Sequence, residues 1–187
     1  QRVQALKDVS DMIVLDYLSN GRAKFGIGRG LARREYDTFG LDMNSARDRF
    51  DESAEFVMSA LETGVAEWSG KYYQQVRTEL RPRPLASFKD RFYAVAMSSD
   101  SVPVCAQLGA QMMSFAQKPW AQMKDHFDTY RRLFKEHHGR EAKPPICVDF
   151  LACDESAEKA EALAREHMAN YYVTVMDHYE MAGDHFK

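Results

Sequence analysis

The sequence lacks the features of several classes of protein. Its 187 residues include only three cysteines, an odd number without metal-ligand spacing, so neither a disulfide framework nor a zinc site is expected. No apolar run approaches the length of a membrane span, and no signal peptide is visible. The 25 Lys and Arg stand against 28 Asp and Glu, and a net charge of -3 gives no overall attraction to nucleic acid or to an anionic membrane. We therefore expect a cytoplasmic protein with reduced thiols and no nucleic-acid or membrane partner.

The composition is typical of one globular domain. Hydrophobic residues make up 45% of the chain and charged residues 28%, and 187 residues are enough to bury a core. Because there is no internal repeat, low-complexity segment or clear linker, we expect a single domain over residues 1–187. The chain enters a helical pattern directly after Gln1 and stops abruptly at Lys187. We expect both ends to be cuts through a larger fold.

Short apolar runs alternate with amphipathic helices along the chain. We expect four strands, over residues 23–27, 92–97, 111–115 and 145–151. Strands that alternate with helices form parallel sheets, and uninterrupted apolar strands indicate a sheet buried on both faces. A (βα)8 barrel normally needs ~250 residues, so a barrel of this kind would have roughly half of its strands in this chain.

The helices are expected from apolar stripes and from start and stop signals. The first helix is predicted over 3–18, and the second begins at a cap at Asn44 or Ser45, with Asp48 in a capping box. A short third helix is predicted before Gly109. The fourth runs from Pro119 to Gly139, and the last begins at about Ser156. The apolar stripe of the last helix is predicted to face the core. The segment 65–85 is predicted to be extended and irregular.

The first candidate site is FGIGRG, at the end of the first predicted strand. Its glycines alternate, and the chain runs on into LARREYDTFG, so the spacing does not fit the GxGxxG dinucleotide motif. Exposed backbone N–H groups beside a fixed guanidinium suit a phosphate, and ligands of parallel α/β folds bind at the carboxyl ends of strands. Residues 22–49 contain seven cations against four acids: Arg22, Lys24, Arg29, Arg33, Arg34, Arg47 and Arg49 against Glu35, Asp37, Asp42 and Asp48. A tight turn with solvated arginines is the alternative interpretation.

A hydroxyl cluster, Ser98-Ser99-Asp100-Ser101, directly follows the second predicted strand. Such hydroxyls commonly cap a helix, and they can also hydrogen-bond a phosphate. In a parallel barrel this turn and FGIGRG would open onto the same face. Two turns suited to an anion on one face favour a ligand site, although capping explains at least one of the serines.

The motifs, taken together, resemble the luciferase-like monooxygenase family, in particular its bacterial luciferase branch. The matching runs are Leu15 to Arg22 (LDYLSNGR), Gly26 to Gly30, and Phe39 to Asp42 (FGLD). The similarity continues through AVAMSSDSVPVCAQLG, through the helix end EHHG and through PPICVDFLACD with the helix ESAEKA. Nearly the whole chain is covered, and the motif set is specific only as a combination.

The resemblance implies a TIM-type (βα)8 barrel that uses reduced FMN or, in some relatives, the deazaflavin F420. It places the flavin phosphate on Arg29, with Arg47 as a second arginine and with support from the Leu31 backbone and the hydroxyl turn. The implied cofactor-binding residues are Arg29, Gly30, Leu31, Arg47, Met97, Ser98 and Ser101. No metal site is implied, and the catalytic residue stays unknown. Gly28 stands where bacterial luciferase has a reactive cysteine, and Met97 where it has a glutamate, so thiol chemistry is not expected here.

The implied activity is that of an FMN-dependent monooxygenase. Reduced FMN and O2 would form a C4a-peroxyflavin that oxygenates a small aldehyde- or ketone-like substrate. An F420-dependent oxidoreductase and a non-catalytic flavin-binding relative are the alternatives. The implied partners are a separate flavin reductase, the small-molecule substrate and a second copy of the chain. A homodimer would form through helix 3–18, with Met12, Ile13 and Tyr17 as contacts, unless these residues simply pack on the barrel.

Three further features have two interpretations each. Glu35 either tunes the charge beside the phosphate turn or balances Arg33 or Arg34 at the surface. Trp68, Tyr72 and Tyr73 either cover a substrate entrance or pack locally after a helix. His178 and His185 have no familiar zinc spacing and are expected to be structural or exposed.

Overall fold

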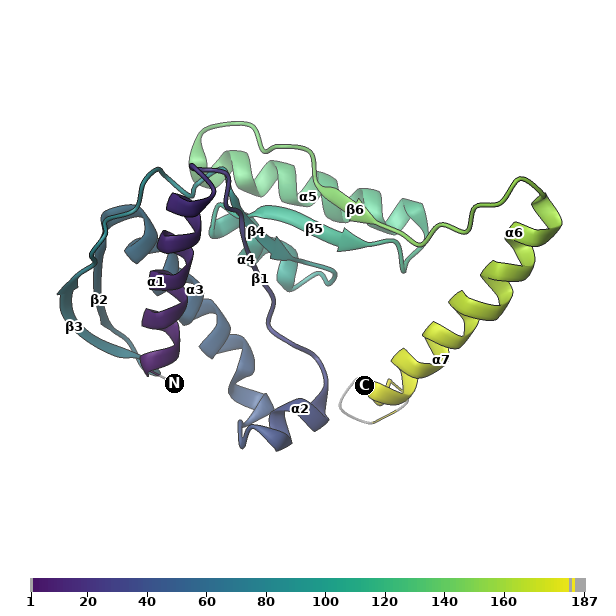
Figure 1. Cartoon of the computed structure of the whole chain (residues 1–187), viewed down its shortest axis with the longest axis horizontal. Helices are drawn as coiled ribbons and strands as arrows, with labels where there is room; N and C mark the ends of the chain where they lie inside the picture. The colour runs from purple at the N-terminus through teal and green to yellow at the C-terminus, as the bar shows by residue number, and fades with distance from the viewer. Residues whose placement is uncertain (1, 182, 184–187) are drawn as a thin grey trace. The chain divides into compact units, whose positions relative to one another are not determined.

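The computed structural model describes residues 2–181 and 183 (Figure 1). The chain divides into two compact units. One comprises residues 1–28 and 47–148, and the other comprises residues 29–46 and 149–187. Each unit is described by itself.

The first unit is built on a four-stranded parallel sheet in the order β1-β4-β5-β6. Its strands are β1 (Phe25–Ile27), β4 (Phe92–Val95), β5 (Gln111–Phe115) and β6 (Ile146–Val148). The four predicted strands are confirmed as the strands of one parallel sheet, and β5 has the predicted bounds. The sheet is not closed into a barrel.

A two-stranded antiparallel hairpin was not predicted. It consists of β2 (Val65–Ser69) and β3 (Gln74–Glu79) and stands where the sequence indicated irregular chain. The sequence of β3, QQVRTE, contains a single aliphatic residue, so it gives no alternating apolar pattern. The hairpin packs with α1 (Arg2–Leu18) and α3 (Ala46–Thr63), where Phe56, Leu61, Ala66 and Leu80 share a core with Val9 and Ile13.

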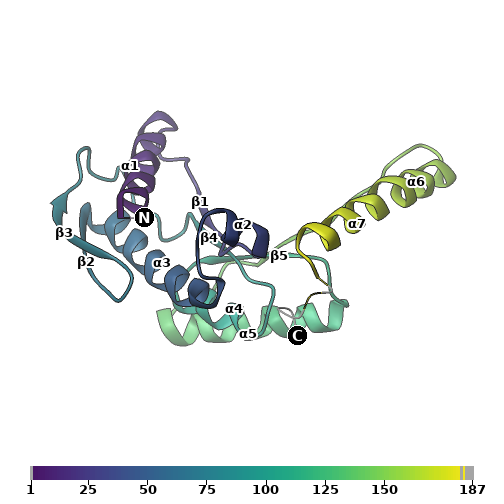
Figure 2. The same ribbon diagram turned by 90° about the horizontal axis from the view of Figure 1, so that it is seen from below.

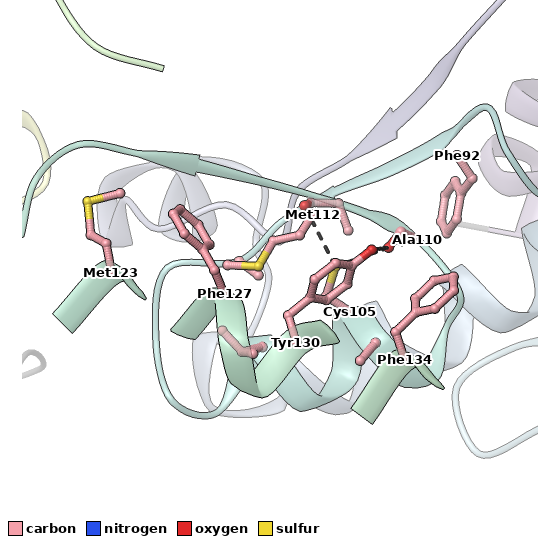
Figure 3. Close-up of a cluster of buried hydrophobic side chains, with 12 residues drawn as sticks. Phe92, Cys105, Ala110, Met112, Met123, Phe127, Tyr130 and Phe134 are labelled. Carbon is pink, nitrogen blue, oxygen red and sulfur yellow. Dashed lines mark hydrogen bonds between the residues drawn. The ribbon is translucent and has the colours of Figure 1, made fainter. Parts of the chain in front are cut away.

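A second core lies between the sheet and the helices α4 (Ser101–Gln107) and α5 (Trp120–His138), which cover one face of the strands (Figure 2). Figure 3 shows Phe127, Tyr130 and Phe134 of α5 directed at Met112 and Phe92 of the sheet, and the Tyr130 hydroxyl donates to the Ala110 carbonyl at 2.9 Å. The predicted signals bound this helix, because Pro119 precedes it and Gly139 ends it in the left-handed region at φ 65.

A buried ion pair fixes the start of β1. Asp16, near the end of α1, is fully buried, and the Arg91 guanidinium pairs with both of its carboxylate oxygens. The same guanidinium donates to the carbonyls of Gly21 at 3.0 Å and Ala23 at 2.9 Å. The end of α1, the turn that follows and the residue before β4 are therefore held together, which fixes the direction in which the chain enters the sheet.

The second unit contains α2 (Arg33–Thr38), a 3-10 turn (Met43–Ser45), α6 (Ala157–Leu163), a π-helical turn (Ala164–Met168) and α7 (Ala169–His178). The helix begins where the sequence predicts, next to Ser156, and the Ser156 hydroxyl caps α6 by accepting from the Lys159 N–H. No residue of α6 or α7 is fully buried, so the expectation that their apolar stripe lines a core is wrong. The periodicity marks a face of a helix but does not identify what covers that face.

The sequence also did not predict the cap of the 3-10 turn that precedes α3. The capping side chain is Asp42, whose Oδ1 accepts from the Asn44 N–H at 3.0 Å and opens the 3-10 turn before α3. The Ser45 hydroxyl donates to the Asp42 carbonyl. A 3-10 turn thus precedes α3, and its capping residue, Asp42, stands two residues before Asn44 and three before Ser45.

Candidate functional site

The glycine turn after β1 has a defined backbone. Gly30 has φ +81, which L side chains rarely adopt, and its next neighbours lead into α2 through the buried Ala32. From α2, the Tyr36 hydroxyl reaches back and donates to the Arg29 carbonyl at 2.7 Å. Arg29, Gly30 and Leu31 therefore lie in one turn that a buried tyrosine closes.

The seven cations of residues 22–49 differ in what they contact. Arg33 pairs with Glu180 through two nitrogens, both at 3.2 Å, and Arg34 lies 3.6 Å from Asp177. Arg22 donates to a backbone carbonyl, and Lys24 and Arg49 lie over tyrosine rings. In the part of the chain that the structure describes, the guanidinium groups of Arg29 and Arg47 make no hydrogen bond or ion pair. These are the two arginines that the resemblance assigns to the flavin phosphate.

Arg47 stands in the first turn of α3, and its neighbours hold the tip of the β2–β3 hairpin. Glu52 accepts from the N–H groups of Tyr72 at 3.0 Å and Tyr73 at 2.9 Å and from the Trp68 indole at 3.1 Å. Burial alone would raise the pKa of Glu52, but these hydrogen bonds lower it from its ordinary value. Asp48 accepts from the Tyr72 hydroxyl and pairs with Lys71. Local packing is thus the better interpretation of Trp68, Tyr72 and Tyr73.

The hydroxyl turn is satisfied internally. The Ser101 hydroxyl accepts from the N–H groups of Met97 at 3.0 Å and Ser98 at 2.9 Å, and it donates to the Ser98 carbonyl. The Ser98 hydroxyl donates to the Ser101 oxygen and accepts from the Ser101 N–H. The Ser98 hydroxyl thus accepts from the first N–H of α4, whereas the Ser101 hydroxyl holds the turn before the helix and does not cap it. A ligand at this turn would have to replace one of these bonds.

The seven predicted cofactor-binding residues fall in both units. Arg29, Gly30 and Leu31 belong to one unit, and Arg47, Met97, Ser98 and Ser101 belong to the other. Their assembly into one site stays a prediction. Sequence reasoning missed Tyr36, Asp42 and Glu52. Only Asp42 could have been found from local sequence, because Asp side chains often accept a hydrogen bond from the backbone N–H two residues later, here that of Asn44.

The remaining candidates are local contacts. The Glu35 carboxylate lies 3.2 Å from the His178 ring nitrogen and does not pair with Arg33 or Arg34. The prediction that Glu35 balances the charge of one of these arginines is therefore wrong. His185 lies outside the described residues. Among residues 2–181 and 183, no three His, Cys, Asp or Glu side chains form a group that could hold a metal ion. Cys105 is buried, which raises its thiol pKa to about 12, whereas Cys147 and Cys153 are exposed.

Comparison with known proteins decides the family. The family model for luciferase-like monooxygenases matches residues 9–187. The chain belongs to that family. Its similarity to the alkanal monooxygenase alpha chain of Aliivibrio fischeri is 24% identity over 172 residues, covering 89% of this chain and 47% of that protein. The chain thus spans about half the length of the luciferase-like relatives that it matches.

Solved structures of this family share the fold. The monooxygenase RslO1 from Streptomyces bottropensis superimposes with a TM-score of 0.79 at 20% identity, covering 94% of this chain and 54% of that one. The oxygenating constituent of 3,6-diketocamphane monooxygenase from Pseudomonas putida, solved with FMN, superimposes with a TM-score of 0.71 at 16% identity. The match covers 95% of this chain and 54% of that one. An F420-dependent secondary alcohol dehydrogenase superimposes with a TM-score of 0.69 at 17% identity, covering 86% of this chain and 49% of that one. The parallel sheet and its helices are therefore about half of a luciferase-like TIM-type barrel. None of the described helices is long and apolar enough to cross a membrane.

Proposed function

We propose that this chain holds the phosphate of reduced FMN in a flavin-dependent monooxygenase that oxygenates a small aldehyde- or ketone-like substrate. The observation that carries the proposal is the contrast among neighbouring arginines. Arg33 and Arg34 have acidic partners, whereas no described group neutralises Arg29 or Arg47. A guanidinium presents a planar fork of donors that matches a phosphate, so an uncommitted arginine beside a glycine turn suits that ligand.

The chain's own groups fit a phosphate by their chemistry. Arg29 would supply the charge, and the N–H groups of Gly30 and Leu31 would supply neutral donors. Arg47 would add a second charge, and the backbone of Met97 with the hydroxyls of Ser98 and Ser101 would line the other part of the site. Because both serine protons already have acceptors, a phosphate would bind there by exchange rather than at free donors.

When bound, reduced flavin would supply the activation of O2, as it does in flavin monooxygenases generally. The protein's part is to hold the phosphate, to orient the ring system and to keep water from the reacting atoms. A separate flavin reductase would provide the reduced cofactor, and we propose the cytoplasm as the compartment in which both proteins act.

The test compares FMN with riboflavin, which lacks the phosphate. Dissociation constants are measured by flavin fluorescence for the parent chain, for Arg29→Ala and for Arg34→Ala, a neighbouring arginine that already has an acidic partner. The parent is expected to prefer FMN. Arg29→Ala is expected to weaken FMN binding by about ten- to a hundredfold with little effect on riboflavin, since a hydrogen bond to a charged group contributes roughly 1.5–3 kcal/mol.

The control variant Arg34→Ala is expected to bind both flavins as the parent does. Equal affinity of the parent for FMN and riboflavin would contradict the proposal. Mixing the reduced complex with oxygenated buffer in a stopped-flow instrument then tests the oxygen chemistry. Flavin oxidation as fast as that of free FMN would leave a flavin-binding relative without monooxygenase activity.

An F420-dependent oxidoreductase is the second candidate, and the fold shared with an F420-dependent alcohol dehydrogenase favours it. F420 also carries a phosphate group, so Arg29 would have the same role. Competition between F420 and FMN for the parent chain distinguishes the two functions. Displacement of FMN by low micromolar F420 would favour the F420-dependent oxidoreductase, and displacement of F420 by FMN would favour the monooxygenase.

We also propose a homodimer through α1. Ile13 is only 1% exposed and packs in the core of its own unit, so the prediction of Ile13 as a contact is wrong. The exposed apolar side chains of the same helix are Val14, Leu15, Tyr17 and Leu18, and the last is 79% exposed. Leu18→Glu is expected to convert a dimer to a monomer in sedimentation experiments, and a parent chain that sediments as a monomer would contradict the proposal.

A further inference from the structure

Tyr36 is the residue that the proposed site does not yet explain. It lies on α2, seven residues after Arg29, and only 9% of it is exposed. Its hydroxyl donates to the Arg29 carbonyl at 2.7 Å, a short bond inside one compact unit. The contact is therefore made to the backbone of the turn and not to the guanidinium that would carry the charge.

The geometry of the peptide bond gives this contact a consequence. The peptide that joins Arg29 to Gly30 is planar and trans, so its C=O and its N–H point to opposite sides. Holding the Arg29 carbonyl on the Tyr36 side directs the Gly30 N–H away from Tyr36. Rotation of this peptide by half a turn would exchange the two groups and present an oxygen where the N–H had been.

Gly30 makes such a rotation inexpensive. The rotation changes ψ of Arg29 and φ of Gly30, and glycine accepts both signs of φ at little cost. A phosphate would be attracted by the N–H and repelled by the carbonyl oxygen. An anion site at this turn thus needs an external group that selects one orientation of the peptide.

We propose that Tyr36 is a positioning residue that holds the Arg29–Gly30 peptide with its N–H available to the bound phosphate. This inference rests on the proposed function, since it assigns Tyr36 to the same anion site. Tyr36 would not touch the phosphate and would act only through the backbone of the turn.

The surroundings of Tyr36 suit this role. Its burial raises the pKa of the phenol, with the Arg29 charge acting in the opposite direction, so the hydroxyl stays protonated and can donate near neutral pH. The helix that carries it also makes an ion pair within the same unit, between Arg33 and Glu180 at 3.2 Å. The donor is thus fixed to a frame that does not depend on the ligand.

The experiment compares Tyr36→Phe with the parent. This variant keeps the ring and removes only the donor. Dissociation constants of FMN and riboflavin are measured for both proteins, together with the melting temperature. We expect about five- to tenfold weaker FMN binding and unchanged riboflavin binding, because one neutral hydrogen bond is worth roughly 1 kcal/mol. Tyr171→Phe is the control, since that exposed hydroxyl in the same unit has no hydrogen bond within the described residues.

The outcomes separate this inference from the function on which it rests. A parent that does not prefer FMN over riboflavin overturns the proposed function and this inference with it. A parent that prefers FMN, together with a Tyr36→Phe variant that keeps the full preference, overturns the inference alone. Equal weakening of both flavins with a lower melting temperature would show a purely structural tyrosine and would also overturn it.

Discussion

The two ends of β1 use arginine in opposite ways. Where the chain enters the strand, Arg91 is committed on every side, to both carboxylate oxygens of the buried Asp16 and to backbone carbonyls. Where the chain leaves the strand, the Arg29 guanidinium makes no hydrogen bond or ion pair within the described residues, and only the Arg29 carbonyl is bonded, to the Tyr36 hydroxyl. The same side chain serves folding when its donors are used inside the protein and recognition when they are left for a ligand.

The two turns proposed to meet the phosphate differ in the same manner. The hydroxyl turn satisfies its own donors through Ser98 and Ser101, so its shape is set from within. In the glycine turn, the N–H groups of Gly30 and Leu31 have no hydrogen bond to another described residue, and Tyr36 sets the shape of the turn from α2. Stability and binding should therefore respond to different substitutions, and this separation can be tested.

The largest expected effect is on stability and comes from Arg91→Ala. It would leave Asp16 buried without a partner, and removal of one member of a buried pair typically costs about 3–5 kcal/mol. Arg29→Ala should change the free energy of unfolding by less than about 0.5 kcal/mol while it abolishes the preference for FMN. Urea denaturation of both variants tests this difference. Equal destabilisation by the two substitutions would show that Arg91 and Arg29 do not differ in their contribution to folding.

The next effect is on the glycine turn. Gly30→Ala places a side chain at φ +81, which costs about 1–2 kcal/mol, so FMN binding should weaken roughly tenfold as the turn relaxes to another backbone conformation. Gly28→Ala is the matched control, because a Cβ there meets no atom within 4 Å and φ lies outside the strained range. Similar effects of the two substitutions on FMN binding would show that the backbone of Gly30 is not selected for the anion.

The sequence predicted the elements that local signals define. The strand over 111–115 and the helix between Pro119 and Gly139 agree with the structure because each is bounded by residues that end or begin an element. The β2–β3 hairpin could not be predicted in this way. Its tip is held by Glu52, which lies 16 to 21 residues earlier on a helix, and periodicity contains no information on such contacts.

The candidate site shows the same limit. The glycines and the excess of cations predict an anion site at the turn after β1, and the resemblance assigns the phosphate to Arg29 and Arg47. The sequence alone did not show which cations have partners. Arg33 and Arg34 pair with Glu180 and Asp177, which are more than 140 positions away, whereas no acidic group of the described residues pairs with Arg29. The role of Tyr36 depends on a hydrogen bond to the backbone, for which residue type gives no signal.

A smaller effect is expected from Ser101→Ala in the hydroxyl turn. Its oxygen accepts two N–H groups, so its loss should lower the free energy of unfolding by about 1–2 kcal/mol. The ratio of FMN to riboflavin affinity should fall less than in Arg29→Ala. Ser99→Ala, which removes an exposed hydroxyl, serves as the control, and thermal melts with flavin titrations give both readings. A lost FMN preference at unchanged stability would show that Ser101 is a direct ligand and contributes little to the stability of the turn.

The smallest effect concerns the start of α3, where the uncommitted Arg47 stands five residues before the committed Glu52. The pKa of Glu52 is lower in the folded chain than its ordinary value of 4.5, so its hydrogen bonds contribute their full stability above that pH. This contribution is lost as the pH falls through the lowered pKa, where the folded carboxylate takes up a proton.

Glu52→Gln keeps the size of the side chain and removes the charge, so it should be less stable at pH 7 and should show a shallower loss of stability toward pH 3. Urea midpoints measured across this range for the parent, for Glu52→Gln and for Glu55→Gln, an exposed glutamate of the same helix, test the assignment. The acid dependence should be reduced only in Glu52→Gln, and an unchanged slope there would place the acid sensitivity of the fold elsewhere.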